Sequence, residues 1–385
     1  MDSAEIRNII ARDEDSQHQF KANITNETSL AQEMVAFSNS RGGMILIGVA
    51  DDGSISHLTR EDMGRLSNLV SNAASQQVKP PINPITDNVA MDNGLVMVVH
   101  ILPGISKPYM DKNGVIWVKS GADKRKATAR EEIQRLYQSA GLLHGDDIPV
   151  ANMPIELLDK ERFSVFYETQ YGEALASQPL SLPHIIENLN LTHQGVLNIA
   201  GALLFGKNPQ FKLPAFIIKC VSYPGTSIDV DHYVDSQDMV GTIKQQFDDA
   251  LGFILRNMKR IQGNKGVNSL GDLEIPKIVF EEIVANAIIH RDYFVSAAIR
   301  IFIFSDRVEI ISPGHLPNNL TIDNIKNGNS NIRNPILASF ATKILPYRGL
   351  GSGIRRALKE YPDITFEDDR EGTLFKVVIL RTLDA

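Results

Sequence analysis

The chain has 385 residues, 43% of them hydrophobic, and a formal net charge of −7 at pH 7. This length predicts about two or three domains, and the acidic balance argues against binding nucleic acid over the whole surface, although a local basic groove is still compatible with it. No apolar run is long enough to span a bilayer, the first residues lack a secretory signal pattern, and the single Cys220 cannot form an internal disulfide. We therefore expect a cytoplasmic protein with no membrane partner.

Residues 1–145 are expected to form the first domain. Apolar patterning predicts its helices over 4–11, 28–39 and 129–140 and its strands over 44–49, 94–101 and 114–119. Near its end lies a group of basic residues, called the 119–130 cluster here: Lys119, Lys124, Arg125, Lys126 and Arg130. Such a cluster can neutralise phosphates, and the preceding Trp117 can stack a base if it is exposed. The alternative is a solvated helix entry, in which Thr128 and Glu131 form a capping box.

Four stretches of this domain follow a family pattern: Glu14-Asp-Ser with Phe20-Lys21, Ala36-Phe-Ser-Asn39 with Gly42-Gly43, Ile47-Gly-Val with Asp51-Asp-Gly53, and Trp117-Val-Lys-Ser-Gly121. They resemble the Schlafen-type AlbA domain, and the resemblance covers most of the first 140 residues. It implies that the domain binds DNA or RNA. Lys21 and Arg41 are further candidates for phosphate contacts.

In some Schlafens this domain also cleaves RNA with three carboxylates. Glu14 matches the first position and Asp51 or Asp52 the third, whereas the second position is Gln19. Because clustered carboxylates hold Mg²⁺ or Mn²⁺, a neutral amide lowers the affinity of the site for metal. We expect nuclease activity to be lost and the three carboxylates to be a degenerate metal site. The alternative is that they are plain surface carboxylates at a helix start and a turn.

Residues 146–210 are expected to form a helical connector between the two functional domains. A turn-rich segment over 145–149 opens it, and Thr192 is expected to cap an apolar helix over 196–205. A degenerate helix-turn-helix is the alternative. Because the helix is too apolar to present a reading face to DNA, packing on the following domain is favoured.

In the third segment, 211–385, Glu282 and Asn286 lie four residues apart and share one face of a predicted helix. A carboxamide oxygen can ligate Mg²⁺ that carries nucleotide phosphates, and a carboxylate can deprotonate a water. Downstream, a glycine segment (Gly349, Gly351 and Gly353) would let backbone N–H groups approach phosphates at the start of a helix. The alternative is an ordinary amphipathic helix followed by a glycine turn.

Strands are predicted over 299–304, 308–311 and 374–380, with a basic helix over 354–360 before the last. The order helix, strand, strand, loop, glycine turn, helix, strand resembles the GHKL ATPase fold of gyrase B, MutL and histidine kinases. The segments 282–293, 309–314 and 333–335 are most similar to a bacterial branch of RecG-like transcriptional regulators.

The resemblance implies that Glu282 is the general base and Asn286 the Mg²⁺ ligand of an ATP site. It also implies a lid over about 315–348 and further cofactor contacts by Asp292, Ser312, Gly314, Arg333 and the three glycines. One position departs from the pattern. The fold usually has an aspartate that accepts the adenine amino group, and this chain has Ser312, so nucleotide identity and turnover are open.

The predicted fold class is α/β (α+β), with an N-terminal Schlafen AlbA-type domain, a helical connector and a C-terminal GHKL-type α/β sandwich. The predicted protein binds ATP and Mg²⁺, hydrolyses ATP weakly if at all, and couples the nucleotide state to DNA or RNA binding in transcription regulation or antiviral and mobile-element defence. A homo-oligomer and a protein partner from the same operon are further expectations. The alternatives are a metal-dependent nuclease and a non-catalytic DNA-binding regulator with a degenerate ATPase fold.

Overall fold

The computed structural model of the protein describes residues 1–228, 231–262, 271–317 and 320–381. The chain divides into two compact units, Met1–Leu143 and His144–Ala385. Hydrophobic clusters form separately within each unit. Among the helices of the described residues, we find none with the length and apolar character needed to cross a membrane.

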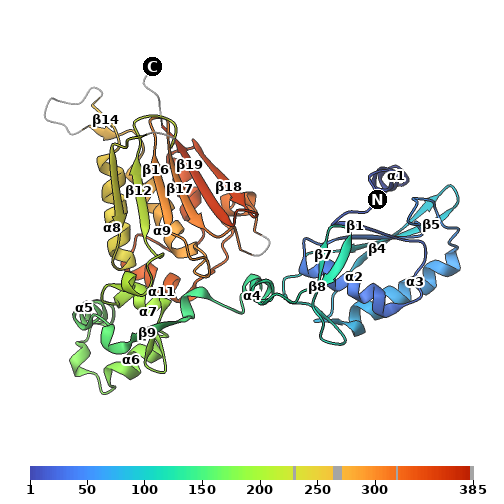
Figure 1. The fold of residues 1–385 in the computed structure, drawn as a ribbon, viewed down its shortest axis with the longest axis horizontal. Helices are drawn as coiled ribbons and strands as arrows, with labels where there is room; N and C mark the ends of the chain where they lie inside the picture. The colour runs from blue at the N-terminus through green and yellow to red at the C-terminus, as the bar shows by residue number, and fades with distance from the viewer. Residues whose placement is uncertain (229–230, 263–270, 318–319, 382–385) are drawn as a thin grey trace. The chain divides into compact units, whose positions relative to one another are not determined.

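A four-stranded sheet organises the first unit (Figure 1), in the order β1 (His18–Lys21), β2 (Gly43–Ile47), β5 (Gly94–Ile101) and β4 (Ile85–Met91). Strands β1 and β2 are parallel, and the other neighbours are antiparallel. Successive side chains of a strand point to opposite faces. Ile45 and Val99 therefore join the core that α2 (Glu27–Asn39) and α3 (Arg60–Asn72) cover. Leu46 and Val98 pack on the other face with Ile6 of α1 (Ser3–Ile10).

The rest of the first unit is built around short strands. The π-helical turn η1 (Ala73–Gln77) leads into β3 (Val78–Lys79), which pairs with β6 (Met110–Asp111), and β7 (Trp117–Ser120) pairs with β8 (Asp123–Lys126). Leu136 of α4 (Arg130–Ser139) packs against Val118 of that hairpin. Much of the 119–130 cluster thus lies on a hairpin. The capping box expected at Thr128 and Glu131 is wrong, because α4 starts after Ala129 and has no side-chain cap.

The second unit contains a six-stranded sheet (Figure 1). Its order is β13 (Asp235–Met239), β12 (Ile218–Ser222), β16 (Ile299–Ile303), β17 (Arg307–Pro313), β19 (Leu374–Leu380) and β18 (Ile364–Asp369). Only the β12–β16 pair is parallel among these strands. Buried and exposed residues alternate along β12 and β16, which leaves one face of the sheet for helices and the other towards solvent.

Three helices build the covered face: α8 (Ile243–Arg256), α9 (Lys277–His290) and α12 (Gly353–Glu360). Helix α9 is apolar around most of its circumference, and nine of its 14 residues are buried. A helix of this kind belongs inside the fold and not at its surface. A polar side chain on the buried face of α9, such as that of Glu282, is therefore held in a fixed, largely water-free setting.

The expected connector shares the core of the second unit. It contains a small sheet of β10 (Thr192–His193), β11 (Val196–Asn198) and β9 (Pro149–Pro154), and the helices α5 (Lys160–Tyr171), α6 (Leu182–Asn188) and α7 (Ile199–Phe205). Phe166 of α5 and Phe205 of α7 lie 5.4 Å and 5.9 Å, between ring centroids, from Phe340 of α11 (Pro335–Ile344). The capping role expected for Thr192 is wrong, because Asn198 caps α7 by accepting from the Gly201 N–H at 2.8 Å.

The remaining short elements of the described chain are η2 (Gly145–Asp147), η3 (Ile155–Leu157), η4 (Leu175–Ser177), η5 (Pro209–Phe211), β14 (Arg260–Ile261) paired with β15 (Asp272–Leu273), and α10 (Ile322–Lys326). Helix α10 lies within the segment expected to be a lid, of which residues 318–319 fall outside the described residues. Segments predicted as strands after α9 correspond to β16, β17 and β19, whereas β18 had no clear sequence signal.

Candidate functional site

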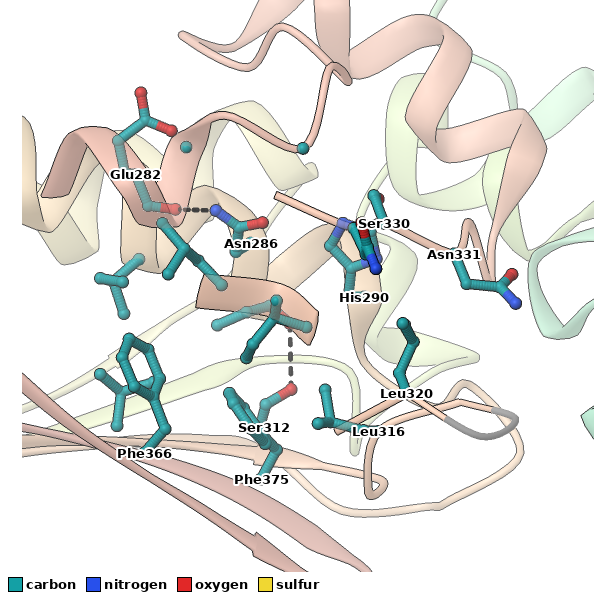
Figure 2. A pocket seen from close by; sticks show the side chains of 18 of the residues that line it. Glu282, Asn286, His290, Ser312, Leu316, Leu320, Ser330, Asn331, Phe366 and Phe375 are labelled. Carbon is teal, nitrogen blue, oxygen red and sulfur yellow. Dashed lines mark hydrogen bonds between the residues drawn. The ribbon is translucent and has the colours of Figure 1, made fainter. Parts of the chain in front are cut away.

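A pocket of about 1000 Å³, part of it open to solvent, lies between α9, the end of β17 and the segment 315–354. Figure 2 shows two different ends. Glu282 and Asn286 stand on one turn of α9 at the polar end, and Phe366 and Phe375 lie at the apolar end. The glycine turn at 349–353 and a loop with Ser330 complete the wall.

Asn286 is oriented by its own helix. Its Nδ2 donates to the backbone carbonyl of Glu282 at 2.6 Å. A carbonyl can only accept, so the amide nitrogen must face the helix and the amide oxygen is directed the other way, as Figure 2 shows. The oxygen is the atom that suits a hard cation such as Mg²⁺.

Glu282 is almost fully buried, with 2% of its side chain exposed, and its Oε1 lies 2.5 Å from Nη2 of Arg356. Burial raises the pKa of the Glu282 carboxyl, while Arg356 and Arg348 act in the opposite direction. The arginines oppose the cost of placing a carboxylate there. The result is a carboxyl that is more basic than usual and paired with a cation.

Gly353, the first residue of α12, lies directly against this pair. A Cβ there would collide with Oε2 of Glu282 and stand 3.2 Å from Nδ2 of Asn286. Gly351 has a φ of 68° and would collide with the carbonyl of Gly328 if it carried a Cβ. Gly353 thus allows the start of α12 to approach α9 closely, and Gly351 allows the glycine turn to approach the loop around Gly328. Backbone N–H groups at a helix start favour a negatively charged ligand.

The other end of the pocket is apolar except for Ser312. The rings of Phe366 and Phe375 are stacked with 6.2 Å between centroids, and Leu316 and Leu320 lie nearby in Figure 2. The Ser312 hydroxyl donates to the carbonyl of Ala287 at 3.1 Å. That bond uses its one hydrogen, so towards a ligand Ser312 can only accept.

Two expected cofactor contacts lie outside the pocket wall. The Asp292 carboxylate accepts from the Phe294 N–H at 2.9 Å, and Nη2 of Arg333 donates to the His315 carbonyl at 2.8 Å. A Cβ on Gly314, whose φ is 98°, would collide with both residues. Asp292 and Arg333 therefore pack behind Gly314 and support the pocket rather than line it.

The wall residues that sequence reasoning missed include His290, Arg348 and Arg356. His290 Nε2 lies 3.0 Å from the Tyr347 hydroxyl, and burial, helped by Arg333, lowers the pKa of His290 to about 4. The imidazole is therefore neutral at pH 7. Arg356 was foreseeable, because it sits three residues after Gly353 and so faces the same side of α12.

In the first unit, the candidate metal ligands do not form a set. Glu14 Oε1 accepts from Gln19 Nε2 and from the Phe20 N–H, both at 2.5 Å. Asp52 accepts from the Ser54 N–H at 2.9 Å in an exposed turn, and Asp51 is exposed beside it. Within the described ranges, no group of three His, Cys, Asp or Glu residues could hold a metal ion. The side chains present do not fit a divalent cation there.

Lys119 occupies the interior next to Glu14 and Gln19. Its ammonium donates to Gln19 Oε1 at 2.9 Å and to the Ala122 carbonyl, and only 2% of its side chain is exposed. Burial lowers the pKa of Lys119, and Glu33 and Glu14 oppose that shift. Lys119 is thus an internal cation, which corrects its assignment as a surface phosphate contact.

The other members of the 119–130 cluster differ in accessibility. Lys124 is bound to the buried Glu33 at 2.6 Å. The exposed cations contact surface carboxylates or a ring: Arg125 contacts Glu132 at 2.7 Å, Arg130 contacts Glu131 at 3.0 Å, and Lys126 lies over Trp117 at 5.6 Å. Surface pairs of this kind are weak and exchange readily for phosphates. Arg41 is exposed and Lys21 half-buried.

Trp117 is itself half-buried. Its Nε1 donates to Asp111 Oδ2 at 2.9 Å, and its ring packs against the core of the first unit. The indole is held as part of the domain, with Lys126 over it, and does not stand free for stacking on a base.

The first residues of the second unit, 144–146, contact the chain at Arg333 and Leu337. The Nδ1 of His144 donates to the Arg333 carbonyl at 3.1 Å, and Asp146 Oδ2 accepts from the Leu337 N–H at 2.9 Å. Burial raises the pKa of Asp146 from 3.8 to about 6. A Cβ on Gly145 would stand 2.8 Å from Cβ of Tyr293. The contacts at Arg333 and Leu337 thus lie within the segment expected to be a lid.

Comparison with known proteins identifies both parts of the chain. Residues 14–128 match the family model "Schlafen, AlbA_2", and residues 296–377 match the family model "Putative ATP-dependent DNA helicase recG C-terminal". The second match begins after α9, so it does not include Glu282 and Asn286.

Among solved structures, the crystal structure of the DIP2311 protein from Corynebacterium diphtheriae is similar at 18% identity and a TM-score of 0.48, covering 98% of this chain and 80% of that one. No curated protein matches the chain. The chain therefore joins a Schlafen AlbA-type domain to a RecG-like ATPase-type domain, as the sequence motifs predicted.

Proposed function

Because the chain joins a Schlafen AlbA-type domain to a RecG-like ATPase-type domain, we propose that it binds ATP with Mg²⁺ in the pocket of the second unit and uses the nucleotide to control DNA or RNA binding by the first. The observation that carries this proposal is the convergence of Glu282, Asn286 and Gly353 at one end of a pocket whose other end is apolar.

The side chains present fit a magnesium nucleotide. The amide oxygen of Asn286 is held free of its helix by the bond to the Glu282 carbonyl. The backbone of the glycine turn and the start of α12 favour phosphate oxygens, and Arg348 adds positive charge to the wall. When bound, the metal would neutralise charge on the phosphates. The residues of this chain would hold and orient the nucleotide, and Glu282 is proposed to accept a proton from water.

The nucleobase would occupy the apolar end of the pocket, against residues of β17, β18 and β19. Phe366 and Phe375 offer aromatic surface, and Ser312 offers one hydrogen-bond acceptor. A neutral acceptor binds an amino group more weakly than a carboxylate does. We therefore propose modest affinity, with a preference for a base that presents an amino donor at this position, such as adenine.

Nucleic-acid binding is proposed for the exposed cations of the first unit: Arg41, Arg125, Lys126 and Arg130. These side chains would contact phosphates and so would bind with little sequence preference. We propose no nuclease, because Lys119 and Gln19 occupy the place that a metal site needs.

Coupling between the two activities is proposed to run through residues 144–146. They contact Arg333 and the start of α11, which lie within the segment 315–348 expected to be the lid. A ligand that reorders the lid would shift the carbonyl to which His144 donates. A lid of this kind, with two arrangements, is a two-state element that a ligand can bias.

A second candidate is a regulator that binds nucleotide without hydrolysing it. The observation that favours it is the ion pair of Arg356 with Glu282, because it occupies the carboxylate that is expected to be the general base. In either case we propose a cytoplasmic role in transcription regulation or in antiviral and mobile-element defence, by analogy with the family. Self-association into a homo-oligomer, or a protein partner from the same operon, would suit such a role.

A titration tests the proposed function. Full-length protein is mixed with ATP and Mg²⁺, and both thermal stabilisation and phosphate release are recorded. A ligand that binds only the folded state stabilises it by RT ln(1 + [L]/Kd), about 2.7 kcal/mol at 100 times Kd. Stabilisation without phosphate release would favour the second candidate. No stabilisation at millimolar nucleotide would refute nucleotide binding.

A further inference from the structure

Arg356 is the residue of the pocket wall that the proposed chemistry leaves unexplained. It lies in the first turn of α12, one turn from Gly353, and its side chain is 33% exposed. Its Nη2 contacts Glu282 at 2.5 Å, while its buried Nε has no hydrogen-bond partner among the described residues. A buried donor without a partner is costly and calls for an explanation.

A guanidinium has five N–H donors in a planar fork, which matches a carboxylate or a phosphate in two-point contact. The closest contact of Arg356 with Glu282 is from Nη2 to Oε1, whereas Nε on the same guanidinium has no partner among the described residues and Oε2 lies beside Gly353. The pair is therefore attractive but not geometrically complete. A phosphate group placed at the start of α12 would offer the fork a better match.

We propose that Arg356 is a triphosphate sensor: it pairs with Glu282 when the pocket is empty and moves to the terminal phosphate when a nucleoside triphosphate binds, which frees Glu282 to accept a proton. This inference rests on the proposed nucleotide site and adds a way for that site to distinguish a triphosphate from a diphosphate. Glu282 is then a competent base only with the triphosphate bound.

The electrostatic surroundings agree with an exchange of partners. The charged and titratable groups around Glu282 are Arg356 on α12, Arg348 and Tyr347 before the glycine turn, and Glu281 on α9 itself. Glu281 is bound to Lys277 at 2.8 Å, which weakens its influence. Burial raises the pKa of Glu282 while Arg356 opposes the rise.

The first experiment measures affinity by calorimetry for Mg²⁺ with a non-hydrolysable ATP analogue and for Mg²⁺ with ADP. Arg356→Gln should lose about tenfold or more in affinity for the triphosphate and little for ADP, as loss of a charged hydrogen bond to phosphate predicts. The matched control is Arg355→Gln, which removes the same charge from an exposed neighbour on the same helix and should change neither affinity.

Glu282→Gln provides a second arm with the opposite sign. It removes the competitor for Arg356, so affinity for the triphosphate analogue should rise above that of the wild type, and the rise should vanish in the double variant Glu282→Gln/Arg356→Gln. The double variant also guards against misfolding, because it leaves no unpaired buried carboxylate. Thermal unfolding without nucleotide checks that each variant is folded.

The ratio of triphosphate to diphosphate affinity is the readout that a merely structural arginine would not change. If the wild type binds both nucleotides and Arg356→Gln binds each of them as tightly as the wild type does, the sensor is refuted while the nucleotide site stands. If the wild type binds neither nucleotide, the proposed function itself fails.

Discussion

Asn286 donates its side-chain amide to the backbone carbonyl of Glu282 at 2.6 Å, so one turn of α9 fixes both polar groups of the pocket. The bond sets the direction of the Asn286 oxygen, and the burial of α9 fixes the Glu282 carboxylate. This arrangement puts a cation ligand and a base at neighbouring positions with distinct roles.

The two side chains should therefore separate binding from turnover. Asn286→Ala is expected to weaken the binding of Mg²⁺-ATP by about tenfold or more, because it removes the oriented oxygen. Glu282→Gln should retain binding and suppress phosphate release. Affinity by calorimetry and release of phosphate check the two parts. Hydrolysis in Glu282→Gln at the wild-type rate would disprove the general-base assignment.

Ser312 should determine preference for the base. Since its hydrogen is given to the Ala287 carbonyl, Ser312 can accept from the adenine amino group but cannot donate to the guanine oxygen. Ser312→Ala should lower affinity for ATP by about five- to tenfold, equivalent to one hydrogen bond, and leave GTP nearly unchanged. Ser330→Ala, on the opposite wall, is the control. If Ser312→Ala leaves the ratio of ATP to GTP affinity unchanged, the nucleobase does not contact Ser312.

Asp146 should give the second unit a characteristic pH dependence. Its folded pKa is raised from 3.8 to about 6, so the folded state holds its proton more tightly than the unfolded chain does. This contribution to stability is fully present below about pH 4 and is lost as pH rises through about 6. The shift corresponds to at most about 3 kcal/mol.

Asp146→Asn keeps an acceptor for the Leu337 N–H and cannot ionise. Its melting temperature should exceed that of the wild type at pH 7.5, and the difference should disappear towards pH 4. Asp249→Asn changes an exposed carboxylate of the same unit and should show no such trend. A difference between Asp146→Asn and wild type that is constant with pH would show that the carboxylate is not buried as described.

The exposed cations of the first unit should control nucleic-acid binding. Charge reversal of Arg125, Lys126 and Arg130 together should weaken binding to all sequences alike and flatten the dependence of log K on log salt, by up to about 0.9 per lost contact with duplex DNA. Lys124 is left intact, since its bond to the buried Glu33 is structural.

The matched control reverses three exposed lysines of the second unit: Lys219, Lys244 and Lys359. It changes the net charge equally and should leave the salt dependence as in the wild type. If both triple variants weaken binding by the same factor, the effect is one of overall charge, and the proposed surface is wrong.

Local sequence signals predicted much of this molecule, and their failures have identifiable causes. The helix carrying Glu282 and Asn286 was recognisable because most of its remaining residues are apolar, as expected of a buried helix. The burial of Lys119 was not, because its partners Gln19 and Glu33 are remote in sequence. Pairing of Arg356 with Glu282 depends on how closely α12 approaches α9, which Gly353 permits but its spacing alone does not reveal.

Nucleic-acid affinity measured with and without nucleotide tests the central claim most directly. Full-length protein is titrated with labelled DNA and RNA at one fixed salt concentration, alone and with Mg²⁺ and a non-hydrolysable ATP analogue. We predict that the analogue changes the affinity for nucleic acid, and that nucleic acid changes the affinity for the analogue by the same factor, as linkage requires. Equal nucleic-acid affinities in both conditions, with nucleotide demonstrably bound, would contradict the account.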